Sequence, residues 1–369
     1  MPAPLVSVIV PCFNAGSMLA PALLSIIRQT YPAIEIIFVD NVSTDGSAAV
    51  AAETLARHQR PFRIVRCETR GANAARNFGY GFASGDYVWW MDADDLVSPD
   101  KTALQVEALE ASPAYDIAFG DYTCRWLPPD YEPSERKRTL APVKDQLHRV
   151  LSGVWYPPPL YLLRRAAADR LQKAEGWAPG RMVATDIEYS ALAALLGMKF
   201  LYVPGAHVTY NIWSKRQISG GTPFDQRLRS LEAIYARLSA FAAAGSARVA
   251  LTPRHRMLLS QDWSVWRLPG ETVSMSRNEG RGTLLRHIPS GREIVLRPWE
   301  SAIAQAMIGS GQALPSYIWG ILLAEVASPA VAEDPADVVE VVTKLRREGF
   351  LVRSAAGEAI GAAQAEADA

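Results

Sequence analysis

The hydrophobic pattern of the first hundred residues alternates short apolar runs with segments of helical spacing. The apolar runs predict four strands, over residues 6–10, 34–39, 62–67 and 87–91. Helical spacing lies between them, over residues 18–29, 48–58 and 72–83. Continuous β-branched runs are typical of strands buried on both faces, and their alternation with helices predicts a mostly parallel α/β sheet flanked by helices.

Polar residues follow three of these four strands. They are Asn14, the pair Asp40-Asn41, and the acidic run from Asp92 to Asp95. In open α/β sheets ligands bind at the carboxyl ends of the strands. We therefore expect these side chains to line a binding site.

The pattern changes near Gly245. Before it, we predict an amphipathic helix over residues 185–196 and a short strand over residues 200–203. After it, we predict three strands, over residues 272–276, 283–287 and 293–296. Three helices are predicted to follow, over residues 299–308, 316–327 and 335–347. The predicted division is one α/β domain over 1–244, a small α+β domain over 245–354 and a loose tail over 355–369.

Composition narrows the class of protein. The 369 residues hold 38 basic and 38 acidic side chains, so the net charge gives no reason to expect nucleic acid or membrane as a partner. The three cysteines are scattered, which predicts reduced thiols in a cytoplasmic protein. Neither a signal peptide nor a transmembrane segment is predicted, because the apolar runs are too short or interrupted.

The acidic run carries the clearest chemistry. Asp92 and Asp94 are two residues apart at a strand end, so both carboxylates can address one small volume. Such hard oxygen ligands suit Mn²⁺ or Mg²⁺, and a divalent ion would neutralise the charge of a diphosphate. The alternative is a solvated turn after a strand. Asp95 is predicted to cap the next helix.

Four motifs, in order, resemble the family 2 glycosyltransferases with the A-type (GT-A) fold. They are SVIVPCFN from Ser7, IIFVDNVSTDGS from Ile36, GANAARNFG from Gly71, and the acidic run. The resemblance covers residues 5 to about 215. It implies a metal-dependent, inverting glycosyltransferase that takes its sugar from a nucleotide diphosphate-sugar, with a UDP-sugar expected.

The resemblance implies a donor site at the strand ends. Pro11, Phe13 and Asn14 would line the nucleobase and ribose, and Asp40 would accept a hydrogen bond from a uracil-like base. The alternative for Asp40 is a turn residue. Asn41 stands where the family most often has a second Asp, which leaves the base preference open.

Basic and acidic residues complete that implied site. Arg70 or Arg76 would lie near the base or diphosphate, Asp92 on the ribose side, and Asp94 on the metal, with Asp92 close to it. The alternative for Arg76 is a surface arginine on a helix.

The family's general base comes from an acidic pair that opens a helix. Here Thr185-Asp186 precedes a glycine and a short strand ending in Val-Pro, which makes Asp186 the implied catalytic base. The alternative is a helix N-cap. Glu188 would point to the side of the helix.

Two further pairs are weaker candidates. Lys215 and Arg216 follow the strand and would clamp phosphates, or form an ordinary loop pair. Trp155 and Tyr156 would stack on an acceptor, or be buried aromatics.

The C-terminal segment loosely resembles a winged-helix peptide-binding unit. Three functions follow: sugar transfer to a saccharide or small hydroxyl acceptor, transfer to a peptide or protein presented by that module, or non-catalytic binding of a sugar nucleotide or nucleic acid. The presence of Asp40, Asp92, Asp94 and Asp186 disfavours the third function, non-catalytic binding. A structural lid or dimerisation piece is the other interpretation of the module, which leaves a homo-oligomer open.

Overall fold

The computed structural model describes residues 2–127, 132–153, 156–181, 183–213, 224–260, 266–267, 273–278, 282–296, 300–301, 304–305, 308, 335–348 and 350–353. The chain divides into two compact units. The N-terminal unit holds Met1–Leu147 and Trp155–Ala250, and the C-terminal unit holds His148–Val154 and Leu251–Ala369. This division falls a few residues beyond the change of pattern at Gly245 and adds the segment 148–154 to the second unit.

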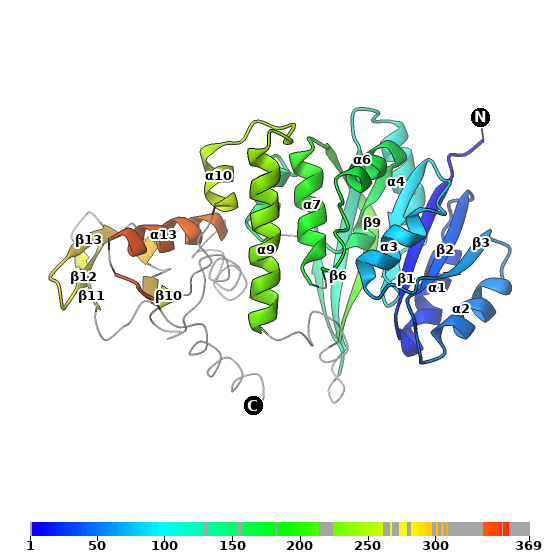
Figure 1. Ribbon diagram of the computed structural model, residues 1–369, viewed down its shortest axis with the longest axis horizontal. Coiled ribbons are helices and arrows are strands. Elements are labelled where there is room, and N and C mark those ends of the chain that lie inside the picture. The colour runs from blue at the N-terminus through cyan, green and yellow to red at the C-terminus, as the bar shows by residue number, and fades with distance from the viewer. Residues whose placement is uncertain are drawn as a thin grey trace. The chain divides into compact units, whose positions relative to one another are not determined.

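The N-terminal unit is built on a nine-stranded sheet with the order β3-β2-β1-β4-β8-β6-β9-β5, and β7 pairs with β6 (Figure 1). Its strands are β1 (Val6–Cys12), β2 (Ile34–Asp40), β3 (Phe62–Arg66), β4 (Tyr87–Trp90), β5 (Leu96–Val97), β6 (Ile117–Leu127), β7 (Ser134–Arg138), β8 (Leu162–Arg164) and β9 (Phe200–Trp213). The first four strands run parallel, which confirms the predicted parallel sheet. The later strands add antiparallel pairs, beginning where β8 meets β4.

Helices flank the sheet (Figure 1). They are α1 (Leu19–Ile27), α2 (Ser47–Ala56), α3 (Ala72–Tyr80), α4 (Lys101–Glu110), α6 (Arg165–Lys173) and α7 (Thr185–Leu195). Helix α9 (Phe224–Ala243) packs against α7. Helix α5 (Gln146–Leu151) begins in the N-terminal unit and continues into the segment assigned to the C-terminal unit. The three helices predicted between the first strands are confirmed. Helix α3 packs so closely on the sheet that a Cβ at Gly79 would come within 2.7 Å of Ile9 and Val39.

Two predictions about the middle of the chain were wrong. Helix α7 is not amphipathic, because every residue from Ile187 to Leu195 is buried; α6 and α9 pack against it. Strand β9 does not end at Val203 but continues to Trp213. The chain passes Pro204 and Gly205 through an irregularity in the pairing with β6, where Gly120 lies so close that a Cβ would clash with the carbonyl oxygen of Ala206.

The C-terminal unit contains helix α10 (Pro253–Leu259), an antiparallel three-stranded sheet and α13 (Pro335–Arg347). The sheet is formed by β11 (Val273–Asn278), β12 (Gly282–His287) and β13 (Glu293–Leu296); β10 (Trp266–Arg267) pairs with β14 (Val352–Arg353). These three strands and α13 confirm the predicted positions. The predicted helix over 316–327 and the tail over 355–369 lie outside the described residues.

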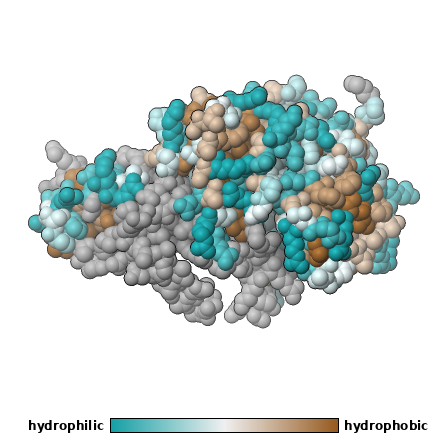
Figure 2. Space-filling model, in the orientation of Figure 1, coloured by the Kyte–Doolittle hydropathy of each residue, from teal (hydrophilic) through white to brown (hydrophobic). Residues whose placement is uncertain are grey.

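Hydrophilic residues cover much of the N-terminal unit on the face shown in Figure 2, with hydrophobic residues among them. The large apolar side chains exposed on this unit include Phe13, Phe62 and Phe78. Among the helices that the structure describes, none is both long enough and apolar enough to span a bilayer.

One buried side chain is unusual for a core. Lys101, at the start of α4, is fully buried, and its Nζ donates to Gln105 Oε1 at 2.7 Å and lies 4.0 Å from the ring centre of Trp89. Gln105 in turn donates to the carbonyl oxygen of Leu160 at 2.8 Å. Burial without a carboxylate partner lowers the pKa of Lys101 well below its usual 10.5.

This lysine should make folding stability depend on pH. Its folded-state pKa is depressed, so the unfolded chain binds more protons and stability rises with pH up to about 10.5. The contribution amounts to at most about 1.4 kcal/mol per pH unit. We expect Lys101→Met to remove this part of the pH dependence of the unfolding free energy. Urea unfolding of both proteins between pH 8 and 10 measures it; identical pH dependence would show that Lys101 stays charged in the fold.

Candidate active site

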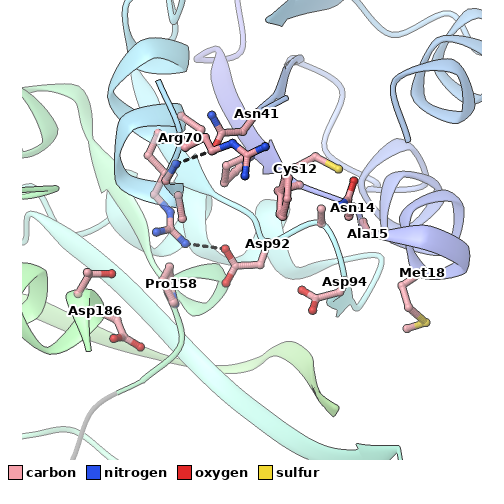
Figure 3. Close-up of a pocket in the computed structure, with 18 of the residues that line it drawn as sticks. Cys12, Asn14, Ala15, Met18, Asn41, Arg70, Asp92, Asp94, Pro158 and Asp186 are labelled. Atoms are coloured by element: carbon pink, nitrogen blue, oxygen red, sulfur yellow. Dashed lines mark hydrogen bonds and ion pairs between the residues drawn. The ribbon is translucent and has the colours of Figure 1, made fainter. Parts of the chain in front are cut away.

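A cavity of about 500 Å³ opens at the carboxyl ends of β1, β2 and β4. Four of its lining residues follow these strands directly, as the polar pattern predicted: Asn14, Asn41, Asp92 and Asp94. Figure 3 shows these four side chains together with Asp186 around the cavity. The fold therefore brings these strand-end residues to one cavity.

The loop after β1 forms one wall. Pro11, Phe13 and Asn14 all line the cavity, and the Phe13 ring is 48% exposed. The loop is tied to the loop after β2, because Asn14 Oδ1 accepts a hydrogen bond from the Thr44 amide at 2.8 Å and Asp45 Oδ2 accepts one from the Gly16 amide at 2.9 Å. Asn14 has a φ of 51°, a left-handed conformation that asparagine tolerates. This wall is thus shaped by local hydrogen bonds.

Asn41 holds a second wall. Its Nδ2 donates to the carbonyl oxygens of Cys67 and Thr69, at 3.0 and 2.7 Å, and its Oδ1 accepts from the Gly71 amide at 2.8 Å. These bonds fix the loop that carries Arg70, whose guanidinium lies 5.6 Å from the ring centre of Phe13. The side chain of Asn41 therefore positions a loop.

Asp40 is not among the lining residues. It is buried, its Oδ1 accepts from the Ser43 amide at 3.1 Å, and its Oδ2 lies 3.8 Å from Arg66 Nη1. These contacts correspond to the alternative interpretation as a turn residue.

Arg76 lies inside the molecule, so its interpretation as a surface arginine was wrong. It is 6% exposed and lines the cavity, and its Nη2 donates to Asp92 Oδ1 at 2.7 Å. Because the pair is largely buried, it is screened little by solvent. Arg76 thus orients Asp92 at the cavity.

The acidic run divides into two roles. Asp94 faces the cavity, and burial together with the negative charge of Asp92 raises its pKa to about 7. Asp95 is fully buried and does not cap a helix, which corrects the sequence prediction; the residue preceding α4 is Asp100. Instead Asp95 Oδ1 accepts a hydrogen bond from the Asn211 amide at 2.9 Å, which joins β9 to the acidic run.

A divalent cation fits the chemistry at Asp94. No donor among the described side chains hydrogen-bonds its carboxylate, and its pKa is raised first by burial and then by the negative charge of Asp92. Within the described parts of the chain, no cluster of three or more His, Cys, Asp or Glu residues could hold a metal ion alone. Oxygen ligands from a bound ligand would therefore have to complete the coordination.

Asp186 enters the same cavity from the first turn of α7. It is not the N-cap, because Ala184 holds that position with a φ of 59°. Burial raises the pKa of Asp186 to about 6, while the positive charge of Arg76 opposes that shift. A carboxylate with such a pKa is suited to accept a proton near neutral pH.

Glu188 is fully buried rather than pointing to the side of the helix. Its Oε1 accepts from Arg237 Nη1 at 2.6 Å, and its Oε2 lies 3.5 Å from Arg181 Nε. Glu188 is therefore held in ion pairs and does not line the cavity.

Among the remaining candidates only Tyr156 is described, and it does not line the cavity. Tyr156 is buried and stacks on Phe119 with ring centres 5.7 Å apart. Trp155, Lys215 and Arg216 lie outside the described residues.

Sequence reasoning missed several lining residues. They include Cys12, Met18, Pro158 and Val183. Pro158 belongs to the proline run and Val183 to the segment before α7; neither residue type signals a site.

The N-terminal part of the chain is similar to known proteins. Residues 7–171 match the family model described as glycosyl transferase family 2. The glycosyltransferase GlyG of Streptococcus pneumoniae serotype 4 is 34% identical over 119 residues, which are 32% of this chain and 39% of that protein. An uncharacterized glycosyltransferase of Escherichia coli K12, YibD, is 40% identical over 105 residues, 28% of this chain and 30% of that protein. The chain thus spans less than half of these relatives.

A solved structure shares the fold. Residues 1–349 of Staphylococcus aureus TarS, in complex with UDP-GlcNAc, superimpose with a TM-score of 0.51 at 17% identity, covering 69% of this chain and 70% of that chain. The chain therefore has a GT-A-like α/β fold and contains, over residues 7–171, a glycosyl transferase family 2 domain.

Proposed function

We propose that this protein is an inverting glycosyltransferase that moves a sugar from a UDP-sugar to a saccharide or small hydroxyl acceptor. The observation that carries the proposal is one cavity at the strand ends that joins Asp92, Asp94 and Asp186 (Figure 3). The family 2 domain and the UDP-GlcNAc complex of TarS support a nucleotide-sugar donor.

The chain's own residues then have distinct tasks. The loop of Phe13 and Asn14 and the loop of Arg70 would enclose the nucleoside, and Arg76 would keep the carboxylate of Asp92 oriented. Asp94, with Asp92 beside it, would hold Mn²⁺ or Mg²⁺, which when bound neutralises the leaving diphosphate.

Asp186 is the proposed general base. It would take the proton from the acceptor hydroxyl as that oxygen attacks the anomeric carbon and the bond to the diphosphate oxygen breaks. The products are the glycosylated acceptor and the nucleoside diphosphate. The raised pKa of Asp186 places its titration near pH 6, so we propose that activity falls as pH is lowered through this value.

For the C-terminal unit we keep the winged-helix-like module as a proposal. The order β11, β12, β13 and later α13 is compatible with it. No observation on this unit favours a peptide acceptor over a saccharide.

Calorimetric titration with nucleotides tests the donor assignment. We expect UDP to bind more tightly than GDP in the presence of Mn²⁺, because the structurally similar TarS structure is a UDP-GlcNAc complex and a UDP-sugar is the donor that we propose. Tighter or equal binding of GDP would overturn the uridine preference. Binding of neither nucleotide would overturn the proposed function itself.

A further inference from the structure

We propose that Trp177 is a positioning residue of the donor site: the face of its indole ring holds the guanidinium of Arg76 in the orientation that pairs with Asp92. Trp177 does not line the cavity, so it would act on the ligand only through Arg76. This inference rests on the proposed nucleotide-sugar function, because its main measurement uses UDP.

The hydrogen bonds of Arg76 do not suffice to fix its orientation. Its Nη2 bond to Asp92 is short, at 2.7 Å, but the Nη1 contact to Asn73 Oδ1 is long, at 3.4 Å, and Nε has no partner among the described residues. The guanidinium carbon lies 4.3 Å from the ring centre of Trp177. Cation–π attraction is strongest for tryptophan and grows when both groups are desolvated, as they are here.

The indole is itself held firmly. Asn77 Nδ2 donates to the carbonyl oxygen of Trp177 at 2.8 Å, and Asn73 Nδ2 donates to that of Ala178 at 2.9 Å. Both asparagines lie on α3, the helix that also carries Arg76. The segment that supplies the ring is therefore fastened to the helix that supplies the cation.

A third contact fixes the plane of the ring. Trp177 stacks on Tyr189 of α7, with ring centres 4.1 Å apart and planes inclined by 14°. Tyr189 lies three residues after Asp186, so the two share one side of the helix. The stack therefore links the helix of the proposed base to the arginine beside Asp92.

The indole N–H gives independent support. Trp177 is 1% exposed, and its Nε1 has no acceptor within the described structure. Burying an unpaired donor is unfavourable, and a phenylalanine or leucine would avoid that cost. The benefit of tryptophan at this position is therefore the face of its ring, and Arg76 lies over that face.

A double-mutant cycle separates positioning from general packing. Wild type, Trp177→Leu, Arg76→Met and the double variant are titrated with UDP in the presence of Mn²⁺. We expect Trp177→Leu to weaken UDP binding about tenfold when Arg76 is present and to have no further effect in the Arg76→Met background. Trp177→Phe keeps an aromatic face and should restore binding to within about threefold of wild type.

Three results would overturn the inference. They are unchanged UDP affinity in a folded Trp177→Leu variant, an equal loss in both Arg76 backgrounds, and failure of Trp177→Phe to bind better than Trp177→Leu. If Trp177→Leu does not fold, Trp177→Phe takes its place in the cycle. We then expect a smaller loss of UDP affinity, and only in the protein that retains Arg76.

Absence of UDP binding by wild type would overturn the proposed function alone. The same variants then report through urea unfolding, where additive effects of the substitutions at Trp177 and Arg76 would show that the ring does not hold the cation.

Discussion

Asp186→Asn should lower turnover about a hundredfold or more while nucleotide binding stays close to wild type. A general base contributes roughly 10²–10⁴-fold to a rate, and asparagine keeps the shape of the side chain but cannot take a proton. The structure strengthens this expectation, because Asp186 faces the cavity and is not the N-cap of α7. Single-turnover assays and UDP calorimetry on the same preparation measure both quantities.

Glu188→Gln provides the matched control on the same helix. Glu188 is buried between Arg181 and Arg237, so its substitution should reduce the unfolding midpoint without changing the pH dependence of the rate. Near-normal turnover of Asp186→Asn would remove Asp186 from the chemistry. Loss of UDP binding in that variant would instead assign Asp186 to the donor site.

Asp94→Ala should nearly abolish transfer, and EDTA should do the same to the wild-type protein. Asp94 is a cavity-facing carboxylate beside the negative charge of Asp92, and a divalent cation would compensate both this carboxylate and the diphosphate. The loss is measured as product formation in the presence of chelator and after Mn²⁺ is restored.

Asp100→Ala is the control for this second prediction. Asp100 is also acidic and only six residues away, but it is exposed before α4 and does not line the cavity. The transferase activity of the Asp100→Ala variant should equal that of wild type. Full wild-type activity in EDTA would exclude a metal from the mechanism.

The strands and the strand-end residues that line the cavity were predictable because their signals are local. A β-branched run such as Val6–Val10 indicates a buried strand, and the parallel order brings its polar end beside that of β4. Asp92 and Asp94 reach the same cavity for this reason alone.

The errors arose where distant parts of the chain decide the outcome. In its local sequence Asp95 resembles a helix cap. Its carboxylate instead accepts a hydrogen bond from the backbone amide of Asn211, 116 residues away. The alternative interpretation of Arg76 as a surface residue fails because the ring of Trp177 lies against its guanidinium. Glu188 is buried only because Arg181 and Arg237 reach it from other segments. Periodicity contains no information on such partners.

The central claim is that the cavity cleaves the bond between a sugar and a nucleoside diphosphate. Its most direct measurement is release of free nucleoside diphosphate from a panel of nucleotide-sugars, with Mn²⁺ present and Asp94→Ala as the blank. We predict release of UDP from at least one UDP-sugar by wild type and none above background by the variant. Equal release by both proteins, or no release from any donor that binds, would contradict the assignment of this cavity as a glycosyltransferase active site.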